Sequence, residues 1–307
     1  MWFVVASKSG YPVIKKKRTT KNPPITHASI VWILMDMQSA GEEPTSQPDR
    51  PSGLDGLIDA QAGRKYWENA EATDDGMLGG IPTFKAYSHI SRMDIQASRA
   101  FLARLGIGLK ANRALVKSAV DAGAGIGRIT TNLLLHVADE VDVVEPVARF
   151  TEPLKGTKGV RQIYNVGLEE WQPIQGTQYD IIWTQWCLGY LTDPQILKYL
   201  EVCKTVLTPE SGLLIVKENV SSGLEDLFDA ADNSVTRLDE RFRHLFAQAN
   251  LRIVRTDEQP VRPLQQARRL LPLNCRRKNF PTNVSKRHLN YHTQHHVNIR
   301  GRAFNPR

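Results

Sequence analysis

The sequence predicts an α/β protein whose core is a doubly wound, mostly parallel sheet. Between residues 94 and 256, short apolar runs alternate with segments that carry apolar residues at helical spacing. One run, Ile181-Ile182-Trp183, is apolar throughout, which is typical of a strand buried on both faces. A glycine-rich turn, Asp121-Ala-Gly-Ala-Gly-Ile-Gly127, separates the first apolar run from a helical segment. Strand, tight turn and helix in this order open a parallel-sheet unit.

The expected elements follow in chain order. An amphipathic helix over 94–105 precedes the sheet, because its apolar residues fall on one face. Strands are expected at 115–120, 140–145, 160–166, 179–186, 212–218 and 251–256. Further helices are expected at 128–137, 193–207 and 236–249. We expect Asp193 to cap the helix over 193–207, with Pro194 in its first turn. After Gln259 the alternation stops.

Charge divides the chain into three parts. Residues 262–307 contain eleven Lys or Arg and no Asp or Glu, so we expect a basic, disordered tail. The whole chain has 40 basic and 32 acidic residues, so residues 1–261 hold 29 basic and 32 acidic ones, a net charge of −3. This acidic body favours a cationic substrate over nucleic acid. Residues 1–52 mix basic, Pro-rich and acidic stretches and are expected to be a low-order leader, which leaves a globular domain over 53–261.

Composition excludes several classes of protein. Only three cysteines occur and none form a C-x-x-C pair, which fits a reducing compartment and argues against a disulfide framework or a zinc site. His292, His295 and His296 have no carboxylate or cysteine nearby, so we expect no metal. No apolar run of about 18 residues is present, so we expect no membrane partner. We expect a cytoplasmic protein; the cluster Lys15–Arg18 is either a nuclear import signal or a solvated charge run.

The glycine turn indicates either a closely approached ligand or a plain tight loop. Glycine permits positive φ and leaves no Cβ between backbone and ligand. The spacing G-x-G-x-G differs from the G-x-G-x-x-G of dinucleotide-binding proteins. With Asp121 in front, it resembles the first motif of class I methyltransferases, which hold S-adenosylmethionine. That resemblance implies a Rossmann-like fold whose sheet ends in a reversed strand. Because the pattern stops after Gln259, we expect this strand to be missing and the sixth strand to have an unpaired edge.

Candidate cofactor residues stand at the carboxyl ends of the expected strands, where ligands bind in open α/β sheets. Gly123 and Gly125 allow the backbone to approach, and Arg128 can pair with the cofactor carboxylate. Glu145 ends the second strand, where a carboxylate can accept two ribose hydroxyls. The alternatives are a solvent-facing charge for Glu145 and an ordinary first-turn residue for Arg128. The ends of the third and fourth strands add three candidates: Leu168, Glu169 and Gln185.

Five stretches together resemble the protein α-N-terminal methyltransferases. They are Asp75-Gly-Met-Leu-Gly-Gly80, Ser88-His-Ile-Ser91, Asp121-Ala-Gly-Ala-Gly-Ile-Gly-Arg-Ile-Thr130, Ile182-Trp-Thr-Gln-Trp186 and Lys217-Glu-Asn219. The resemblance covers about residues 53–259 and implies methylation of Xaa-Pro-Lys/Arg N-termini with S-adenosylmethionine. It implies protein substrates, ribosomal proteins among them. The implied cofactor contacts are Gly123, Arg128, Glu145, Pro146, Val147, Leu168, Glu169 and Gln185; the family commonly has aspartate at the position of Glu145.

The resemblance also implies a peptide site. Asp232 resembles the proton acceptor of the family, while Asp229 and Ser234 resemble the residues that receive the third-position Lys or Arg. The two aspartates would share one face if this stretch is helical, although the residues alone favour a solvated linker. Asn219 resembles the asparagine that bonds the peptide backbone. Trp186 offers a flat wall for the proline ring, with core packing as the alternative.

Aromatic residues complete this set. Tyr66 and Trp67 resemble side chains that close over cofactor and peptide. Tyr190 stands where the family often has histidine; a tyrosine titrating near ~10 is no base at neutral pH, but it can orient the amine. We therefore expect an N-terminal methyltransferase in which Asp232 accepts the proton. A catalytically weak cofactor-binding scaffold and a small-molecule methyltransferase are the alternatives.

Overall fold

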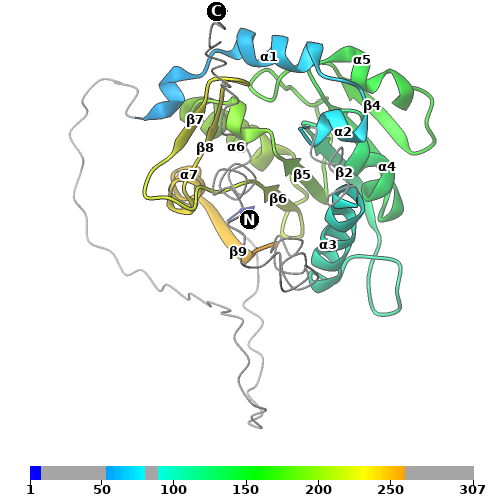
Figure 1. Ribbon diagram of the computed structural model, residues 1–307. Coiled ribbons are helices and arrows are strands. Elements are labelled where there is room, and N and C mark those ends of the chain that lie inside the picture. The colour runs from blue at the N-terminus through cyan, green and yellow to red at the C-terminus, as the bar shows by residue number, and fades with distance from the viewer. Residues whose placement is uncertain (8–52, 80–88, 260–307) are drawn as a thin grey trace, which may run out of the picture.

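Seven strands form one sheet in the order β4-β3-β2-β5-β6-β1-β9 (Figure 1). The computed structural model describes residues 1–7, 53–79 and 89–259. The strands are β1 (Trp2–Ser7), β2 (Val116–Ala122), β3 (Ala138–Val144), β4 (Val160–Tyr164), β5 (Ile181–Gln185), β6 (Leu213–Lys217) and β9 (Leu251–Asp257). Strands β2 to β6 run parallel, while β1 is antiparallel to both β6 and β9. The predicted doubly wound sheet is present, with a strand for each of the six apolar runs.

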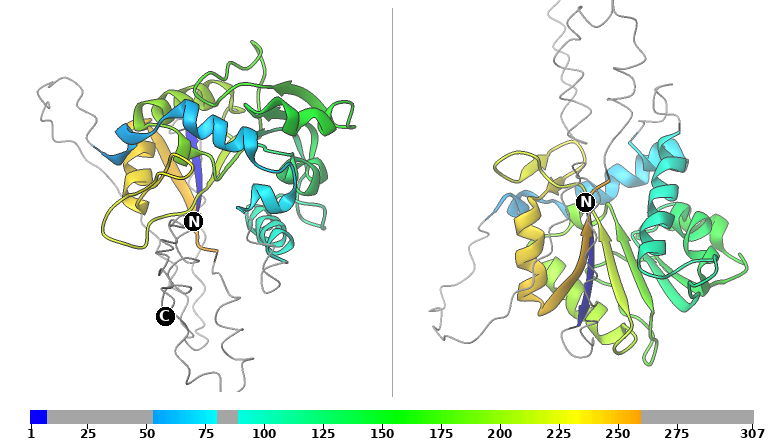
Figure 2. Two further views of the ribbon diagram at one scale, coloured as in Figure 1. Left: turned by 45° about the horizontal axis from the view of Figure 1, so that its top comes forward. Right: turned by 90° about the horizontal axis from the view of Figure 1, so that it is seen from below.

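The reversed strand that we expected to be missing is replaced by β1. Figure 2 shows β1 (dark blue) beside β9 (orange), and its register pairs Trp2 with Lys217 of β6 and Ser7 with Leu251 of β9. The expected absence of a reversed strand is therefore wrong, and so is the assignment of residues 2–7 to a low-order leader. The physical reason is that all of Trp2 to Ala6 can be buried between two strands. The sixth expected strand is β9, which pairs with β1 on one side and is the last strand of the sheet among the described residues. The expectations for residues 8–52 and for the basic tail lie outside the described residues.

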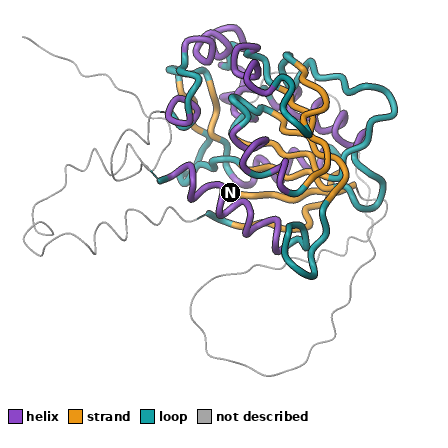
Figure 3. The backbone as a smooth tube through the Cα atoms, turned by 90° about the vertical axis from the view of Figure 1, so that its right-hand side faces the viewer, coloured by secondary structure: helices purple, strands orange, loops and turns teal. Residues whose placement is uncertain are grey.

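Helices cover both faces of the sheet (Figure 3). They are α1 (Ala60–Asn69), α2 (Asp74–Met77), α3 (Ile90–Arg104), α4 (Arg128–Asn132), α5 (Ala148–Thr151), α6 (Asp193–Val206) and α7 (Asp239–Gln248). On one face, Phe3 and Val5 of β1 join the core formed with α6 and α7; on the other, Trp2 and Val4 join the core formed with α3 and α4. No helix in the described ranges is long and apolar enough to cross a membrane.

The ends of three helices differ from the sequence prediction. Thr192, and not Asp193, caps α6: its hydroxyl accepts the N–H of Gln195, whose side chain accepts the N–H of Thr192 in return. Asp193 instead accepts a hydrogen bond from Arg237 at 2.8 Å. The helix expected over 128–137 ends at Asn132 and continues as a 3-10 turn, and α7 begins at Asp239, not at 236.

The acidic stretch 225–234 is a hairpin and not a helical turn. Its strands are β7 (Leu227–Asp229) and β8 (Ser234–Thr236), and Asp229 stands opposite Ser234. Asp232 lies in the connecting turn, where its Oδ1 accepts the N–H of Ser234 at 3.1 Å. Aspartate and asparagine side chains favour such local bonds to the backbone over helix. The two aspartates are brought together all the same.

We expect Phe3→Ala to destabilise the protein by about 3–5 kcal/mol, the usual cost of truncating a buried phenylalanine. Phe3 is fully buried, and its ring lies 5.2 Å from that of Phe246 and 5.7 Å from that of Phe242, both on α7. Urea unfolding measures the change, with Leu109→Ala as the control because Leu109 is 73% exposed. If residues 2–7 were not part of the sheet, both variants would unfold at the same urea concentration as the parent.

Candidate active site

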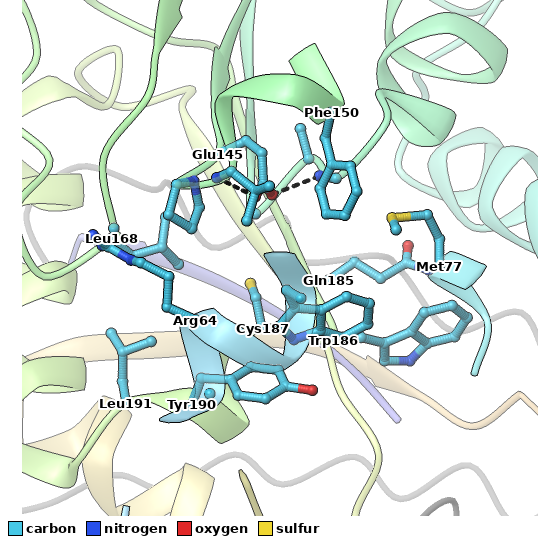
Figure 4. A pocket seen from close by; sticks show the side chains of 18 of the residues that line it. Arg64, Met77, Glu145, Phe150, Leu168, Gln185, Trp186, Cys187, Tyr190 and Leu191 are labelled. Atoms are coloured by element: carbon cyan, nitrogen blue, oxygen red, sulfur yellow. Dashed lines mark hydrogen bonds between the residues drawn. The ribbon is translucent and has the colours of Figure 1, made fainter. Parts of the chain in front are cut away.

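A pocket lies at the carboxyl ends of β2, β3 and β5, where the strand order reverses between β2 and β5 (Figure 4). Residues of α1, such as Arg64 and Trp67, and Met77 of α2 contribute to its wall. All nine residues that the sequence predicts at a cofactor site line it: Gly123, Gly125, Arg128, Glu145, Pro146, Val147, Leu168, Glu169 and Gln185. The structure thus brings these nine residues from four separate segments to one cavity.

The glycine turn needs its glycines for backbone conformation and for space. Gly123 has φ of 80° and Gly127 has φ of 76°, both in the left-handed region. A Cβ on Gly123 would lie 2.6 Å from Sγ of Cys187 and would also narrow the pocket that this residue lines. Asp121, just before the turn, accepts a hydrogen bond from Oγ1 of Thr130 at 2.6 Å, which ties the end of β2 to α4.

Glu145 is held by backbone donors of the pocket. Its Oε2 accepts the N–H of Gly125 and its Oε1 accepts the N–H of Val147, each at 2.8 Å (Figure 4). Each carboxylate oxygen keeps a second lone pair, so ribose hydroxyls can still be accepted. Burial raises the pKa of Glu145 to about 6, although these two N–H groups favour the ionised form. The carboxylate is therefore rigid, buried and close to titration at neutral pH.

Arg128 is a buried cation with an unused donor. Its NH2 lies 2.8 Å from Oδ2 of Asp94 on α3, and the side chain is 6% exposed. Its NH1 is buried and has no hydrogen-bond partner among the described residues. A buried guanidinium nitrogen without a partner is costly, so this atom indicates that a ligand acceptor belongs at the pocket.

Trp186 ends β5 in a strained conformation. Its φ of 56° is in the left-handed region, which is uncommon for a residue with a bulky side chain. Its N–H donates to the carbonyl of Lys217 at 3.0 Å, and its ring lies 5.5 Å from the guanidinium of Arg128. Such strain persists where the surroundings impose it, and it is concentrated at functional sites. Trp186 lines the pocket rather than packing wholly in the core, which favours the first of the two interpretations made from sequence.

Tyr190 connects the pocket to the hairpin. Its hydroxyl donates to Oδ2 of Asp232 at 2.8 Å, and its ring meets Trp67 edge to face, with centroids 5.9 Å apart. Burial, followed by the negative charge of Asp232, raises the pKa of Tyr190 well above its usual value. Tyr190 therefore stays protonated at neutral pH and acts as a donor, as we expected for a tyrosine here.

The remaining peptide-site candidates surround this pair. Ser234 and both aspartates are buried. Burial, then the charges of Asp232 and Asp229, raises the pKa of Tyr66, so both carboxylates act electrostatically on this side chain. Asn219 is half-buried just after β6 and does not line the pocket, so the structure places it near the end of the sheet without showing a role.

Several site residues escaped the sequence prediction. Met77, Cys187 and Arg64 line the pocket, and Asp94 and Lys217 are buried behind it. Asp94 had a signal that could have been used, because it is a charged residue on the apolar face of its helix. Met77 and Lys217 stand in two of the stretches that carry the family resemblance, whereas Arg64 and Cys187 resemble ordinary surface or core residues in sequence.

The fold and this pocket define an S-adenosylmethionine-dependent methyltransferase with a Rossmann-like sheet. The chain belongs to the AdoMet-dependent proline di-methyltransferase family, whose sequence model matches residues 57–270. A SAM-dependent methyltransferase of Leishmania major shares the fold, with a TM-score of 0.57 and 34% identity, over 66% of this chain and 78% of that one.

Two curated relatives carry names that describe an activity. Alpha N-terminal protein methyltransferase 1 of Schizosaccharomyces pombe is 44% identical over 191 residues, which cover 62% of this chain and 83% of the relative. N-terminal Xaa-Pro-Lys N-methyltransferase 1 of Xenopus tropicalis is 37% identical over 201 residues, which cover 64% of this chain and 86% of the relative.

The pocket fits the cofactor of this family. The glycine turn exposes its backbone to the pocket, where a Cβ on Gly123 would collide with Cys187. The unpartnered nitrogen of Arg128 suits a carboxylate, and the oxygens of Glu145 suit ribose hydroxyls. Arg128 and Glu145 therefore match the carboxylate and the ribose of S-adenosylmethionine.

We expect the affinity for S-adenosylmethionine to fall as the pH falls through about 6. Hydroxyl donors favour ionised Glu145, whose pKa in the free protein is raised to about 6, so protonation removes an acceptor. Affinity at pH 5 should be about tenfold weaker than at pH 7.5, because each pH unit below the pKa is tenfold in the ionised fraction. Calorimetry of the parent and of Glu145→Gln measures this. The variant should bind weakly at both pH values. If its affinity depended on pH as that of the parent does, the titrating group would be another one, such as Asp121. Burial raises the pKa of Asp121 to about 6 as well.

Proposed function

We propose that this protein methylates the α-amine of proteins whose N-termini read Xaa-Pro-Lys or Xaa-Pro-Arg, with Asp232 as the proton acceptor. The observation that carries the proposal is the joining of two sites. The cofactor pocket and the acidic hairpin meet at Tyr190, which lines the pocket and donates to Asp232. Family membership supports the methyl transfer, and the names of the relatives support the substrate class.

S-adenosylmethionine, when bound, supplies a sulfonium methyl group to an attacking lone pair. We infer that Gly123, Arg128, Glu145 and Gln185 hold it, for the reasons given above. The chain itself must then orient the amine and remove one proton. An α-amine titrates near ~8, so the base need not be strong and a buried carboxylate is sufficient.

Asp232 suits this role because its carboxylate is fixed at both oxygens. Oδ2 accepts the hydroxyl of Tyr190 and Oδ1 accepts the N–H of Ser234, while the residue is 1% exposed. Tyr190 is a donor in this arrangement, so it holds Asp232 in place and does not compete for the proton. The proton leaves the amine for the carboxylate, and the amine gains a free lone pair.

The peptide would lie between Trp186 and the hairpin. Trp186 provides an apolar wall for the proline ring, held in place by its left-handed backbone. Asp229, 5% exposed, stands across the hairpin from Ser234, where a third-position Lys or Arg would meet negative charge. Trp67 and Tyr66 meet edge to face at 5.3 Å, and we infer that they cover the bound N-terminus and exclude water.

Some variants should lose cofactor affinity, and another should lose turnover while keeping the cofactor affinity of the parent. We expect Gly123→Val and Glu145→Ala to abolish cofactor binding, since one blocks the glycine turn and the other removes the acceptor. Asp232→Asn should keep the cofactor affinity of the parent and lose turnover by about 100-fold or more, the usual contribution of a positioned base. Calorimetry and a peptide assay with labelled cofactor measure the two effects. Unchanged turnover in Asp232→Asn would remove Asp232 as the proton acceptor, and unchanged affinity in Glu145→Ala would remove the ribose assignment.

Activity should require a proline at the second position and Lys or Arg at the third. A neutral third residue forgoes the ion pair that Lys or Arg would make with these buried carboxylates, which should cost about 3–5 kcal/mol. Turnover is compared for Ser-Pro-Lys, Ser-Ala-Lys and Ser-Pro-Gln peptides at saturating cofactor, and only the first should react well. Asp229→Lys should weaken Ser-Pro-Lys strongly and leave cofactor affinity alone. Equal rates on all three peptides would contradict the peptide site and favour a small-molecule methyltransferase.

A further inference from the structure

Three buried side chains meet at the carboxylate of Asp94, at the back of the pocket. Arg128 NH2 lies 2.8 Å from its Oδ2, Gln185 Nε2 donates to the same oxygen at 3.1 Å, and Nζ of Lys217 donates to its Oδ1. Lys217 also donates to Oγ of Ser98, one turn further along α3. Asp94 is 1% exposed, Lys217 2% and Arg128 6%. A single anion thus joins α3, the start of α4 and the ends of β5 and β6.

The charges in this cluster do not balance. One carboxylate faces two cations, so the cluster of Asp94, Arg128 and Lys217 carries one excess positive charge when both are protonated. Burial, together with a smaller effect of the charge of Arg128, lowers the pKa of Lys217 to about 8, although Asp94 acts in the opposite direction. Such an excess is unfavourable in a buried site unless a ligand anion completes it.

The unpartnered atom in the cluster indicates where that anion belongs. Among the described residues, NH1 of Arg128 has no hydrogen-bond partner, whereas its NH2 is held by Asp94. Arg128 lines the pocket; Asp94 and Lys217 do not. Asp94 therefore determines which guanidinium nitrogen is occupied by the protein and which one is left for a ligand.

We propose that Asp94 is a positioning residue of the cofactor site: it anchors Arg128 and Gln185 so that the guanidinium receives the α-carboxylate of S-adenosylmethionine. This inference rests on the proposed cofactor role of Arg128. Asp94 does not touch the cofactor itself. Without Asp94, the two cations repel each other, and Arg128 loses its fixed orientation.

Lys217 completes the anchor from the opposite side. Its ammonium lies 4.4 Å from the ring centroid of Trp2 and 5.4 Å from that of Trp186. The aromatic ring of Trp2 belongs to β1, so this strand closes over the cluster and excludes water from it. Because water is excluded, the bonds to Asp94 are stronger than they would be at the surface.

The test compares two ligands that differ only in the carboxylate. Dissociation constants are measured by calorimetry for S-adenosylmethionine and for decarboxylated S-adenosylmethionine, and their ratio reports the contribution of the carboxylate. In the parent protein the decarboxylated ligand should bind at least tenfold more weakly. In Arg128→Met the two ligands should bind about equally, so that the ratio falls to about one. In Asp94→Asn the ratio should fall at least fivefold, because Arg128 is present but no longer anchored.

A matched control separates positioning from stability. Asp142, on β3, is also a buried aspartate, 1% exposed, and it does not line the pocket. It accepts hydrogen bonds from Tyr179 and from Arg161. Asp142→Asn should lower the melting temperature and leave the ratio unchanged. A ratio that is unchanged or raised in Asp94→Asn would overturn the inference, since a structural or purely electrostatic role predicts those results.

A double variant covers the case in which Asp94→Asn does not fold. Asp94→Asn with Lys217→Met removes both members of a buried pair, which is tolerated far better than removing one. The ratio should stay low in this folded variant; a ratio restored to the parent value would show that Asp94 only balances Lys217, and would overturn the inference. If Arg128→Met keeps the parent ratio, or if the parent binds neither ligand, the cofactor role of Arg128 is wrong. The role of Asp94, which rests on it, is then wrong as well.

Discussion

The whole site depends on the placement of β6 between a strand on each side. In this register Lys217 stands opposite Gln185 of β5, and β1 pairs along the other edge. Glu218, the next residue, is buried, and its Oε1 accepts the N–H of Cys187 at 2.8 Å. This carboxylate holds the turn that follows β5 and keeps Trp186 in its left-handed conformation. If the second partner of β6 were absent, the pocket would lose the support of one wall.

The charges of the site are segregated in a way that would suit an anionic group of one ligand and a cationic group of another. Cationic groups, Arg128 and Lys217, gather behind the ends of β5 and β6 around one aspartate. Acidic groups, Asp229 and Asp232, gather in the hairpin of β7 and β8. Tyr190, which lines the pocket and donates to Asp232, is a neutral donor, which a histidine in its place would not always be near pH 7. The tyrosine therefore keeps a single protonation state at neutral pH.

Much of this arrangement could be predicted from sequence because it depends on local patterns. The apolar runs and the glycine turn predicted the strands and their carboxyl ends, and the ends of parallel strands meet at one edge. The cap of α6 was assigned wrongly to Asp193, although the Thr-x-x-Gln signature of a capping box begins at Thr192. The place of β1 was not predictable, because a short apolar run carries no information about a partner two hundred residues away. The contacts of Asp94 depend on the relative placement of α3, β5 and β6, which periodicity does not specify.

The pairing of β1 has a consequence for the order in which the protein can assemble. Trp2 pairs with Lys217 of β6, and Ser7 pairs with Leu251 of β9, so both strands that pair with β1 are synthesised long after it. Contacts between such distant residues require closure of a very long loop, which slows folding. Until β6 and β9 emerge, the apolar side chains of β1 have no native surface to cover them. Until then, the apolar strand β1 of a nascent chain is exposed and can associate with other apolar surfaces. A chaperone that bound it would delay formation of the sheet without altering the final fold.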